Sequence, residues 1–200
     1  RVTVLSVIVI TISSRKFLLS GEHSYPWYKK GVEDFASYVW PRIRQAFPDA
    51  ELTIQSRQIS QDIVAFLSGD SRVSFVGFVD DFASLFRSYS FFVHPLLTGT
   101  GQKNRLAIAM AQGLCCIASN SAVEGMDLMP FQEYIPLQKS ECLGFDTVVD
   151  MENIISDLAK CKEIAARGYW KIREKFHQNS LAKGYVELYK EAIRINAGWL

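Results

Sequence analysis

The chain has 200 residues, of which 48% are hydrophobic and 22% charged, as is typical of a soluble globular domain that can bury a core. Lys and Arg total 22 and Asp and Glu 21, so the formal net charge is +1 and gives no general attraction to nucleic acid or membranes. Any positively charged site must therefore be local.

The first stretch, from Val2 to Ile12, is apolar and rich in β-branched side chains. It has about half of the roughly 20 residues that a membrane-spanning helix needs, so a buried strand is the better prediction. It shows no signal-peptide pattern, and the chain begins with Arg1 in the middle of apolar sequence. We expect the chain to be a piece of a longer polypeptide.

Strands and helices are then predicted in alternation. Lys16–Ser20 is predicted as a strand stopped by Gly21, and residues 28–47 carry apolar side chains at helical spacing. Pro41 lies inside this helix and is expected to kink or break it. The next predicted elements are a strand at Glu51–Gln55, a short helix at Gln61–Leu67 and a strand at Val73–Val76 that ends at Gly77.

The second half continues the alternation. Asp80 or Asp81 is expected to cap a helix at Phe82–Tyr89, and Gly113 stands where a left-handed helix end favours glycine. After Asp150 we predict helix to the end of the chain, with interruptions at Gly168 and Gly184. The elements between are a strand at Ser90–His94, a helix at Lys103–Gly113, a strand at Cys115–Ser119 and a further strand near Glu133–Leu137.

This order predicts the fold class. Regular alternation of strands and helices favours an α/β fold, with a Rossmann-like parallel sheet, right-handed crossovers and helices on both faces. Ligands of such sheets bind where loops leave the carboxyl ends of the strands.

The loop at residues 94–105 has the features of an anion site at that edge. Its glycines leave backbone amides open to a ligand, while Lys103 and Arg105 place two cations at the start of the next helix. Cations there oppose the helix dipole unless an anion lies between them, and a diphosphate would satisfy both cations and amides. The alternative is a solvated loop whose cations only aid solubility. The residues predicted to bind donor phosphates are Gly21, Gly99, Thr100, Gly101, Gln102, Lys103 and Arg105.

Three other groups are candidates. Val76, Gly77 and Phe78 follow a buried strand, and we expect a nucleotide base to rest against their main chain; the alternative is a simple strand-to-helix turn. Glu124 could accept hydrogen bonds from ribose or sugar hydroxyls, or only flank a helix start. His23 could reach a leaving group but is expected to be a surface-loop histidine, and His94 is expected to be buried and structural.

The remaining motifs exclude several kinds of site. The cysteines have neither metal-ligand spacing nor a disulfide framework; they are Cys115, Cys116, Cys142 and Cys161. We therefore interpret them as small apolar residues of a protein from a reducing, cytoplasmic compartment. No Ser-His-Asp order, zinc-protease motif or P-loop lysine is present. We therefore predict no metal and no cofactor.

Residues 73–126 resemble the C-terminal domain of group 1 type GT-B glycosyltransferases, and the likeness spans most of residues 16–125. The family shows a strand followed by Gly-Val-Asp-Asp, a proline-ended strand, a glycine turn with two basic residues, an A-M-A-x-G helix and a final Glu-Gly. Here these features fall on Gly77 to Asp81, Pro95, Gly99 to Arg105, Ala109 to Gly113, and Glu124 with Gly125.

The resemblance implies that this chain is a donor-binding domain. In the family such a domain holds a nucleotide-diphosphate sugar, and a separate N-terminal domain holds the glycan, lipid or small-molecule acceptor, as in polysaccharide biosynthesis. Residues 1–15 would end the interdomain crossover, 16–177 would form the Rossmann-like domain and 178–200 a C-terminal helix. Lys103 and Arg105 take the places of the phosphate-binding cations and Gly21 that of a glycine near the phosphates. Besides a cytoplasmic location, peripheral membrane association stays open, because similar enzymes often use lipid-linked acceptors.

One departure from the family keeps alternatives open. The family usually carries a sugar- or ribose-binding glutamate where this chain has Ile108, and its partner carboxylate falls on Thr100. Loss of such a contact would weaken donor binding by about 1–3 kcal/mol, unless Glu124 replaces it. A non-catalytic partner domain with a degenerate donor site, or a sugar-nucleotide epimerase of the same architecture, are the alternatives. A dinucleotide oxidoreductase is disfavoured because no G-x-G-x-x-G follows the first strand.

Overall fold

The computed structural model describes residues 10–99, 103–137, 139–140, 144–145, 148–176 and 190. Its central sheet has six parallel strands in the order β3-β2-β1-β4-β5-β6. This confirms the predicted α/β fold with a Rossmann-like sheet. The strands are β1 (Lys16–Ser20), β2 (Glu51–Gln55), β3 (Val73–Val76), β4 (Phe91–His94), β5 (Cys115–Ala118) and β6 (Ile135–Pro136).

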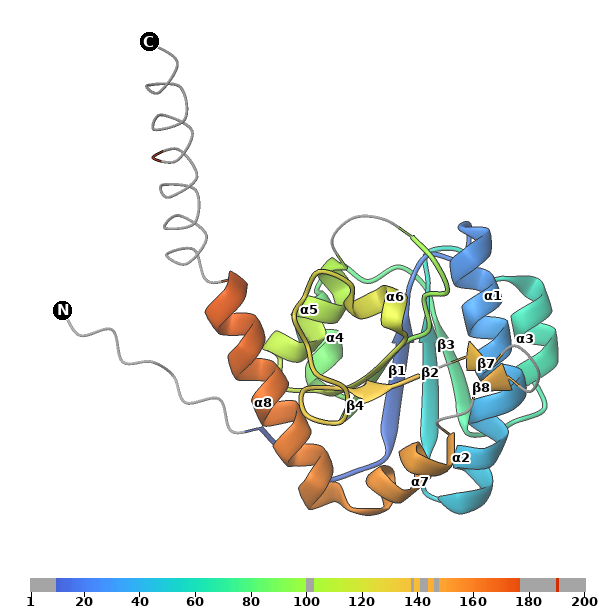
Figure 1. Cartoon of the computed structure of the whole chain (residues 1–200). Helices are drawn as coiled ribbons and strands as arrows, with labels where there is room; N and C mark the ends of the chain where they lie inside the picture. The colour runs from blue at the N-terminus through green and yellow to red at the C-terminus, as the bar shows by residue number, and fades with distance from the viewer. Residues whose placement is uncertain are drawn as a thin grey trace, which may run out of the picture.

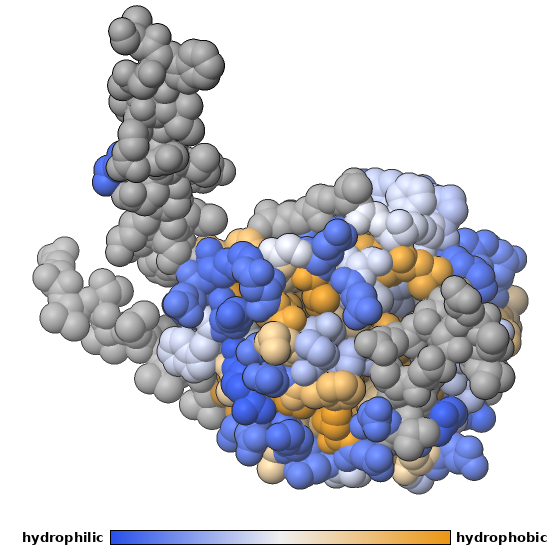
Figure 2. Space-filling view, in the orientation of Figure 1, coloured by the Kyte–Doolittle hydropathy of each residue, from blue (hydrophilic) through white to orange (hydrophobic). Residues whose placement is uncertain are grey.

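Helices cover both faces of the sheet (Figure 1). On one side lie α1 (Pro26–Asp34), α2 (Trp40–Ala46) and α3 (Gln61–Leu67), and on the other α4 (Phe82–Arg87), α5 (Asn104–Ala111) and α8 (Leu158–Phe176). The remaining elements are α6 (Asn120–Val123), α7 (Val148–Ser156) and an antiparallel pair, β7 (Lys139–Ser140) with β8 (Gly144–Phe145). In the same orientation, hydrophilic residues cover much of the surface and apolar residues show between them (Figure 2).

The predicted long helix is divided as Pro41 suggested. Between α1 and α2 lies a π-helical stretch, η1 (Phe35–Val39), in which the Trp40 N–H bonds to the carbonyl of Phe35 five residues earlier. Proline cannot donate a backbone hydrogen bond, and a π-turn directly before it accommodates that loss without ending the helix. The chain thus stays helical from Pro26 to Ala46.

The core is centred on β1 and β4, which are covered on both faces. Phe17 of β1 and Phe91 of β4 are register partners, are fully buried, and stack with ring centroids 4.7 Å apart. Cys115, Cys116 and Cys161 are free and buried, and burial raises the pKa of the Cys116 thiol, as expected of small apolar side chains.

The ends of the chain differ in part from the prediction. Ile10 and Ile12 are buried but residues 10–12 form no strand, and residues 2–9 of the predicted strand lie outside the described residues. The predicted interruption at Gly168 is wrong, because α8 runs through it. A Cβ atom there would lie 2.6 Å from both the Glu133 carbonyl oxygen and Met110 Cε, so this glycine serves close packing.

The predicted interruption at Gly184 lies outside the described residues, as does Cys142. The division of the chain at residues 15 and 177 stays a prediction. Among the described helices, none combines the length and the hydrophobicity needed to cross a bilayer.

Candidate functional site: a cavity between β1 and β4

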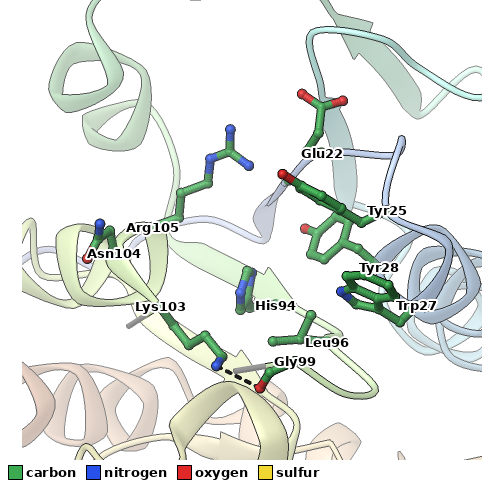
Figure 3. A pocket seen from close by; sticks show the side chains of 11 residues that line it. Glu22, Tyr25, Trp27, Tyr28, His94, Leu96, Gly99, Lys103, Asn104 and Arg105 are labelled. Atoms are coloured by element: carbon green, nitrogen blue, oxygen red, sulfur yellow. Dashed lines mark hydrogen bonds between the residues drawn. The ribbon is translucent and has the colours of Figure 1, made fainter. Parts of the chain in front are cut away.

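The strand order creates a crevice between β1 and β4. The chain leaves β1 toward β2 and β3 on one side, and leaves β4 toward β5 and β6 on the other. Loops after the two strands diverge at such a switch point and leave room for a ligand at the carboxyl edge of the sheet. A cavity of about 400 Å³ lies there, lined by Gly21, Glu22, Tyr25, Trp27, Tyr28, His94, Leu96, Gly99, Lys103, Asn104 and Arg105 (Figure 3).

One wall is built by the end of β1 and the start of α1. Gly21 follows β1 and donates its N–H to the Gln55 carbonyl oxygen at 3.2 Å. A Cβ atom on Gly21 would lie 1.8 Å from Cζ of Tyr28, which is only 3% exposed. Glycine is required here because the Tyr28 ring occupies the space of a side chain. The predicted site residue Gly21 therefore does line the cavity.

The opposite wall is built by the loop after β4 and the start of α5. Gly99 has a φ of 148°, which side-chain-bearing residues rarely adopt, and its carbonyl oxygen accepts a hydrogen bond from Lys103 Nζ at 3.1 Å (Figure 3). Lys103 is the N-cap residue of α5 and Arg105 lies in its first turn. The predicted cation pair thus lines the same cavity as Gly21. Thr100, Gly101 and Gln102 lie outside the described residues.

The cavity lining combines two cations with one carboxylate, Glu22, and with neutral polar rings. Lys103 and Arg105 are half-buried, and the Arg105 guanidinium carbon lies 5.5 Å from the centroid of the Phe82 ring. Burial, together with the charges of Arg105 and Lys103, lowers the pKa of His94 to about 3. Burial also raises the pKa of Tyr28. Near neutral pH the imidazole and the phenol are therefore uncharged.

Several residues that line this cavity have a buried polar atom without a protein partner among the described residues. Within the described part of the chain, no hydrogen bond reaches Glu22 Oε1, Tyr28 Oη or His94 Nδ1, and all three residues line the cavity. Buried polar atoms are normally hydrogen-bonded. The surrounding protein covers these three atoms without satisfying them, so a ligand reaches them only after a small side-chain rotation.

The predicted base-binding residues lie elsewhere along the sheet edge. Val76 ends β3, and the Gly77 carbonyl oxygen accepts a hydrogen bond from Gln55 Nε2 at 2.8 Å. Phe78 is 61% exposed, and the Arg57 guanidinium carbon lies 5.4 Å from its ring centroid. None of the three predicted residues is among those lining the described cavity, so their role in base binding stays a prediction.

The structure places the other candidates as follows. Glu124 is exposed at the end of α6 and outside the cavity lining, and Asp81 caps α4 by accepting the Ser84 N–H at 3.0 Å. The prediction of a surface-loop histidine at His23 is wrong, because the residue is only 5% exposed. His94 is buried, as expected, and also lines the cavity.

Packing explains why His23 is buried. Its Nδ1 accepts the Ser60 N–H at 3.4 Å, and its own N–H donates to Ser56 Oγ at 3.4 Å. Burial lowers the pKa of His23. The residue is held between the end of β1 and the loop that follows β2, and it is absent from the described cavity lining.

Much of the cavity wall was not predicted from the sequence. The signal that would have found it is position, since the aromatic-rich segment at residues 22–28 directly follows a predicted strand, at the edge where ligands bind. The residues not predicted are Glu22, Tyr25, Trp27, Tyr28, Leu96 and Asn104.

Comparisons with solved structures support the fold. The C-terminal domain of the group 1 glycosyl transferase LpcC from Francisella tularensis is 15% identical with a TM-score of 0.65, and the alignment covers 82% of this chain and 87% of that domain. Anabaena HepE, solved with UDP, is 14% identical with a TM-score of 0.69, over 89% of this chain and 49% of that one. Sucrose-phosphate synthase from Thermosynechococcus elongatus is 17% identical with a TM-score of 0.69, over 92% and 47%.

The chain therefore spans about half of the two longer proteins, 49% and 47% of their lengths. No curated protein matches it by sequence. The profile of the family described as glycosyl transferases group 1 matches residues 14–130, which is more than half of the chain and includes every residue that lines the cavity. The chain belongs to the group 1 glycosyl transferase family.

Proposed function

We propose that this chain is the donor-binding half of a glycosyltransferase that moves a hexose from a nucleotide-diphosphate sugar to a glycan, lipid or small-molecule acceptor. The observation that carries the proposal is one cavity, at the switch point of the sheet, that brings together Gly21, Gly99, Lys103 and Arg105. Similar structures support it, since HepE was solved with UDP and with UDP-glucose.

The proposed chemistry follows from where charge develops. When the bond from the sugar to the diphosphate breaks, negative charge accumulates on the leaving diphosphate. Lys103 and Arg105, with the N-terminal amides of α5, would stabilise that charge because they are already held in place around the cavity. In this proposal the two cations and the helix amides offset much of the diphosphate charge without a metal ion or another cofactor. A second domain would hold the acceptor.

The neutral rings of His94 and Tyr28 give the cavity a second type of contact. His94 Nδ1 and Tyr28 Oη are uncharged, buried and unpartnered within the described residues, and in this proposal a small rotation of either ring lets it exchange hydrogen bonds with phosphate or sugar oxygens. We assign the reaction to the cytoplasm, with peripheral membrane association if the acceptor is lipid-linked.

The experiment that tests the proposal is calorimetric titration of the folded chain with UDP, GDP and ADP and with the glucose conjugate of each. We expect one nucleotide series to bind with a single site per chain. If none of the six compounds binds at millimolar concentration to protein whose circular dichroism shows a folded domain, the proposal is wrong.

One observation favours a second function, that of a non-catalytic partner domain. Ile108 stands on α5 where the family resemblance predicts a glutamate, and its side chain is 40% exposed. A degenerate site of this kind would not gain donor affinity when the carboxylate is restored. Ile108→Glu, with Ile108→Gln as the uncharged control, tests this. About tenfold tighter donor binding by the glutamate variant alone supports an enzyme, and no gain supports the partner domain.

A further inference from the structure

The segment between β1 and α1 presents an exposed aromatic surface to the cavity. Tyr25 and Trp27 both line the cavity, yet they remain 53% and 42% exposed. Their rings are stacked, with centroids 5.5 Å apart and planes 18° from parallel. Two large rings kept partly in water at the rim of a cavity are typical of groups that pack against a ligand.

The start of α1 holds the backbone that carries this aromatic pair. The Tyr25 carbonyl oxygen accepts hydrogen bonds from the N–H groups of Tyr28, at 3.0 Å, and Lys29, at 2.9 Å. Pro26 is the first residue of α1, where its fixed φ suits a helix start. Because both rings stand on a rigid helix start, binding to them requires little ordering of the protein.

The pair also lies close to the phosphate-binding side of the cavity. A Cβ atom placed on Gly99 would lie 3.7 Å from Trp27 Nε1, so the indole borders the loop whose carbonyl oxygen receives Lys103. In Figure 3 the two aromatic side chains and the Lys103–Gly99 bond face the same space. A group attached to a diphosphate held at Lys103 would reach the indole directly.

Glu22 gives this wall a charge that a phosphate site does not explain. Its side chain lies across the cavity from Arg105 in Figure 3 and is only half-buried, although one of its oxygens, Oε1, is covered by protein and has no hydrogen-bond partner among the described residues. A carboxylate repels phosphate and accepts hydrogen bonds from hydroxyl groups. The cavity therefore has a cationic side and a side that combines a hydroxyl acceptor with aromatic faces.

We propose that Glu22, Tyr25 and Trp27 form a subsite for the hexose ring of the donor, an inference that rests on the proposed donor-binding function. A hexose carries hydroxyl groups around its edge and C–H bonds on its faces. Glu22 accepts hydrogen bonds from one or two of these hydroxyls, and a ring face packs on Trp27 or Tyr25. This subsite supplies the sugar contact that Ile108 cannot make.

The test compares each sugar nucleotide with its own nucleoside diphosphate. Dissociation constants for UDP, GDP, ADP and their glucose conjugates are measured by calorimetry on wild-type protein, Trp27→Ala and Glu22→Gln. We expect each variant to bind the sugar nucleotide about fivefold to thirtyfold more weakly than wild type does. Its affinity for the nucleoside diphosphate should stay within about twofold of the wild-type value. Trp27→Phe, which keeps a ring, should retain most of the affinity.

Trp170→Ala is the matched control. Trp170 is 66% exposed on α8 and packs edge-on against Tyr169, outside the described cavity lining, so its loss should change neither dissociation constant. Methyl glucoside, a free sugar, is added as a third ligand. Loss of methyl glucoside binding in Trp27→Ala, with an unchanged sugar-nucleotide affinity, would overturn the assignment to the donor sugar.

The outcomes separate this inference from the function on which it rests. One outcome is that a nucleoside diphosphate binds wild-type protein and Trp27→Ala lowers the affinities for diphosphate and sugar nucleotide equally, or lowers neither. This outcome would overturn only the hexose subsite. If no nucleotide binds the wild-type chain, the donor-binding function fails and the subsite fails with it.

Discussion

Gly31 of α1 lies directly against the carbonyl oxygen of Pro95: a Cβ atom at Gly31 would be 1.7 Å from that oxygen. Pro95 follows β4 and precedes the loop that carries Gly99, while α1 carries Tyr28. This contact therefore holds the two walls of the cavity together. It explains why a glycine stands within a helix, where its conformational freedom is otherwise unfavourable.

We expect Gly31→Ala to lower the free energy of unfolding by about 1–3 kcal/mol, because the added methyl group overlaps a backbone atom that cannot rotate away. Urea denaturation measures the change. Gly69→Ala is the control, since a Cβ at Gly69 meets no atom within 4 Å in the described structure. Equal stability of the two variants would contradict the contact between Gly31 and Pro95.

The second prediction concerns Gly168 in α8. Helix propensity alone predicts that Gly168→Ala stabilises the protein by about 1 kcal/mol. We expect the opposite, a loss of about 1–3 kcal/mol, because the new methyl group lies 2.6 Å from the Glu133 carbonyl oxygen and Met110 Cε. The midpoint of thermal unfolding, followed by circular dichroism, should fall. A higher midpoint would mean that propensity outweighs the contact.

The third prediction concerns acid stability and His94. Burial and the nearby Arg105 and Lys103 hold the folded-state pKa of His94 at about 3, whereas the unfolded chain binds a proton at its ordinary value near 6.5. The unfolded state therefore gains protons first as pH falls, so the folded state loses stability below pH 6.5 and down to about pH 3.

His94→Gln removes this titration. Between pH 7 and pH 5 the wild-type protein should lose about 2 kcal/mol more stability than the variant, as measured by urea denaturation at both pH values. Burial also lowers the pKa of His23, so this residue likewise makes the protein less stable in acid. Because His23 is present in both proteins, the difference between them isolates the effect of His94. Identical pH dependence would show that His94 is protonated in the folded state.

The sheet could be predicted because its signals are local. Strands β1 and β4 contain the apolar runs Phe17–Leu19 and Phe91–Val93, which is the pattern of strands covered on both faces. Glycines and aspartates such as Gly77 and Asp81 mark the turns between elements. The cation pair could be predicted for the same reason, since strand end, glycines and helix start are consecutive in sequence.

The rest of the cavity depends on contacts between distant segments. Tyr28 lines it because Gly21 leaves space for the ring, and its ring also approaches His94, with centroids 5.4 Å apart. His23 looks like a loop histidine in sequence and is buried because Ser56 and Ser60 pack over it. Gly168 resembles a helix breaker in the sequence, but in the structure it lets α8 pack against the backbone of Glu133. Periodicity and propensity carry no information on such packing.

The role of the cation pair is decided by the affinity of Lys103→Ala and Arg105→Ala for the nucleoside diphosphate that binds the wild-type chain. Each variant should bind about tenfold to hundredfold more weakly, because each loses a charged hydrogen bond to phosphate. Lys160→Ala, at an exposed position near the start of α8, should bind as wild type does. Unchanged affinity in both cavity variants would contradict the claim that Lys103 and Arg105 hold the donor diphosphate.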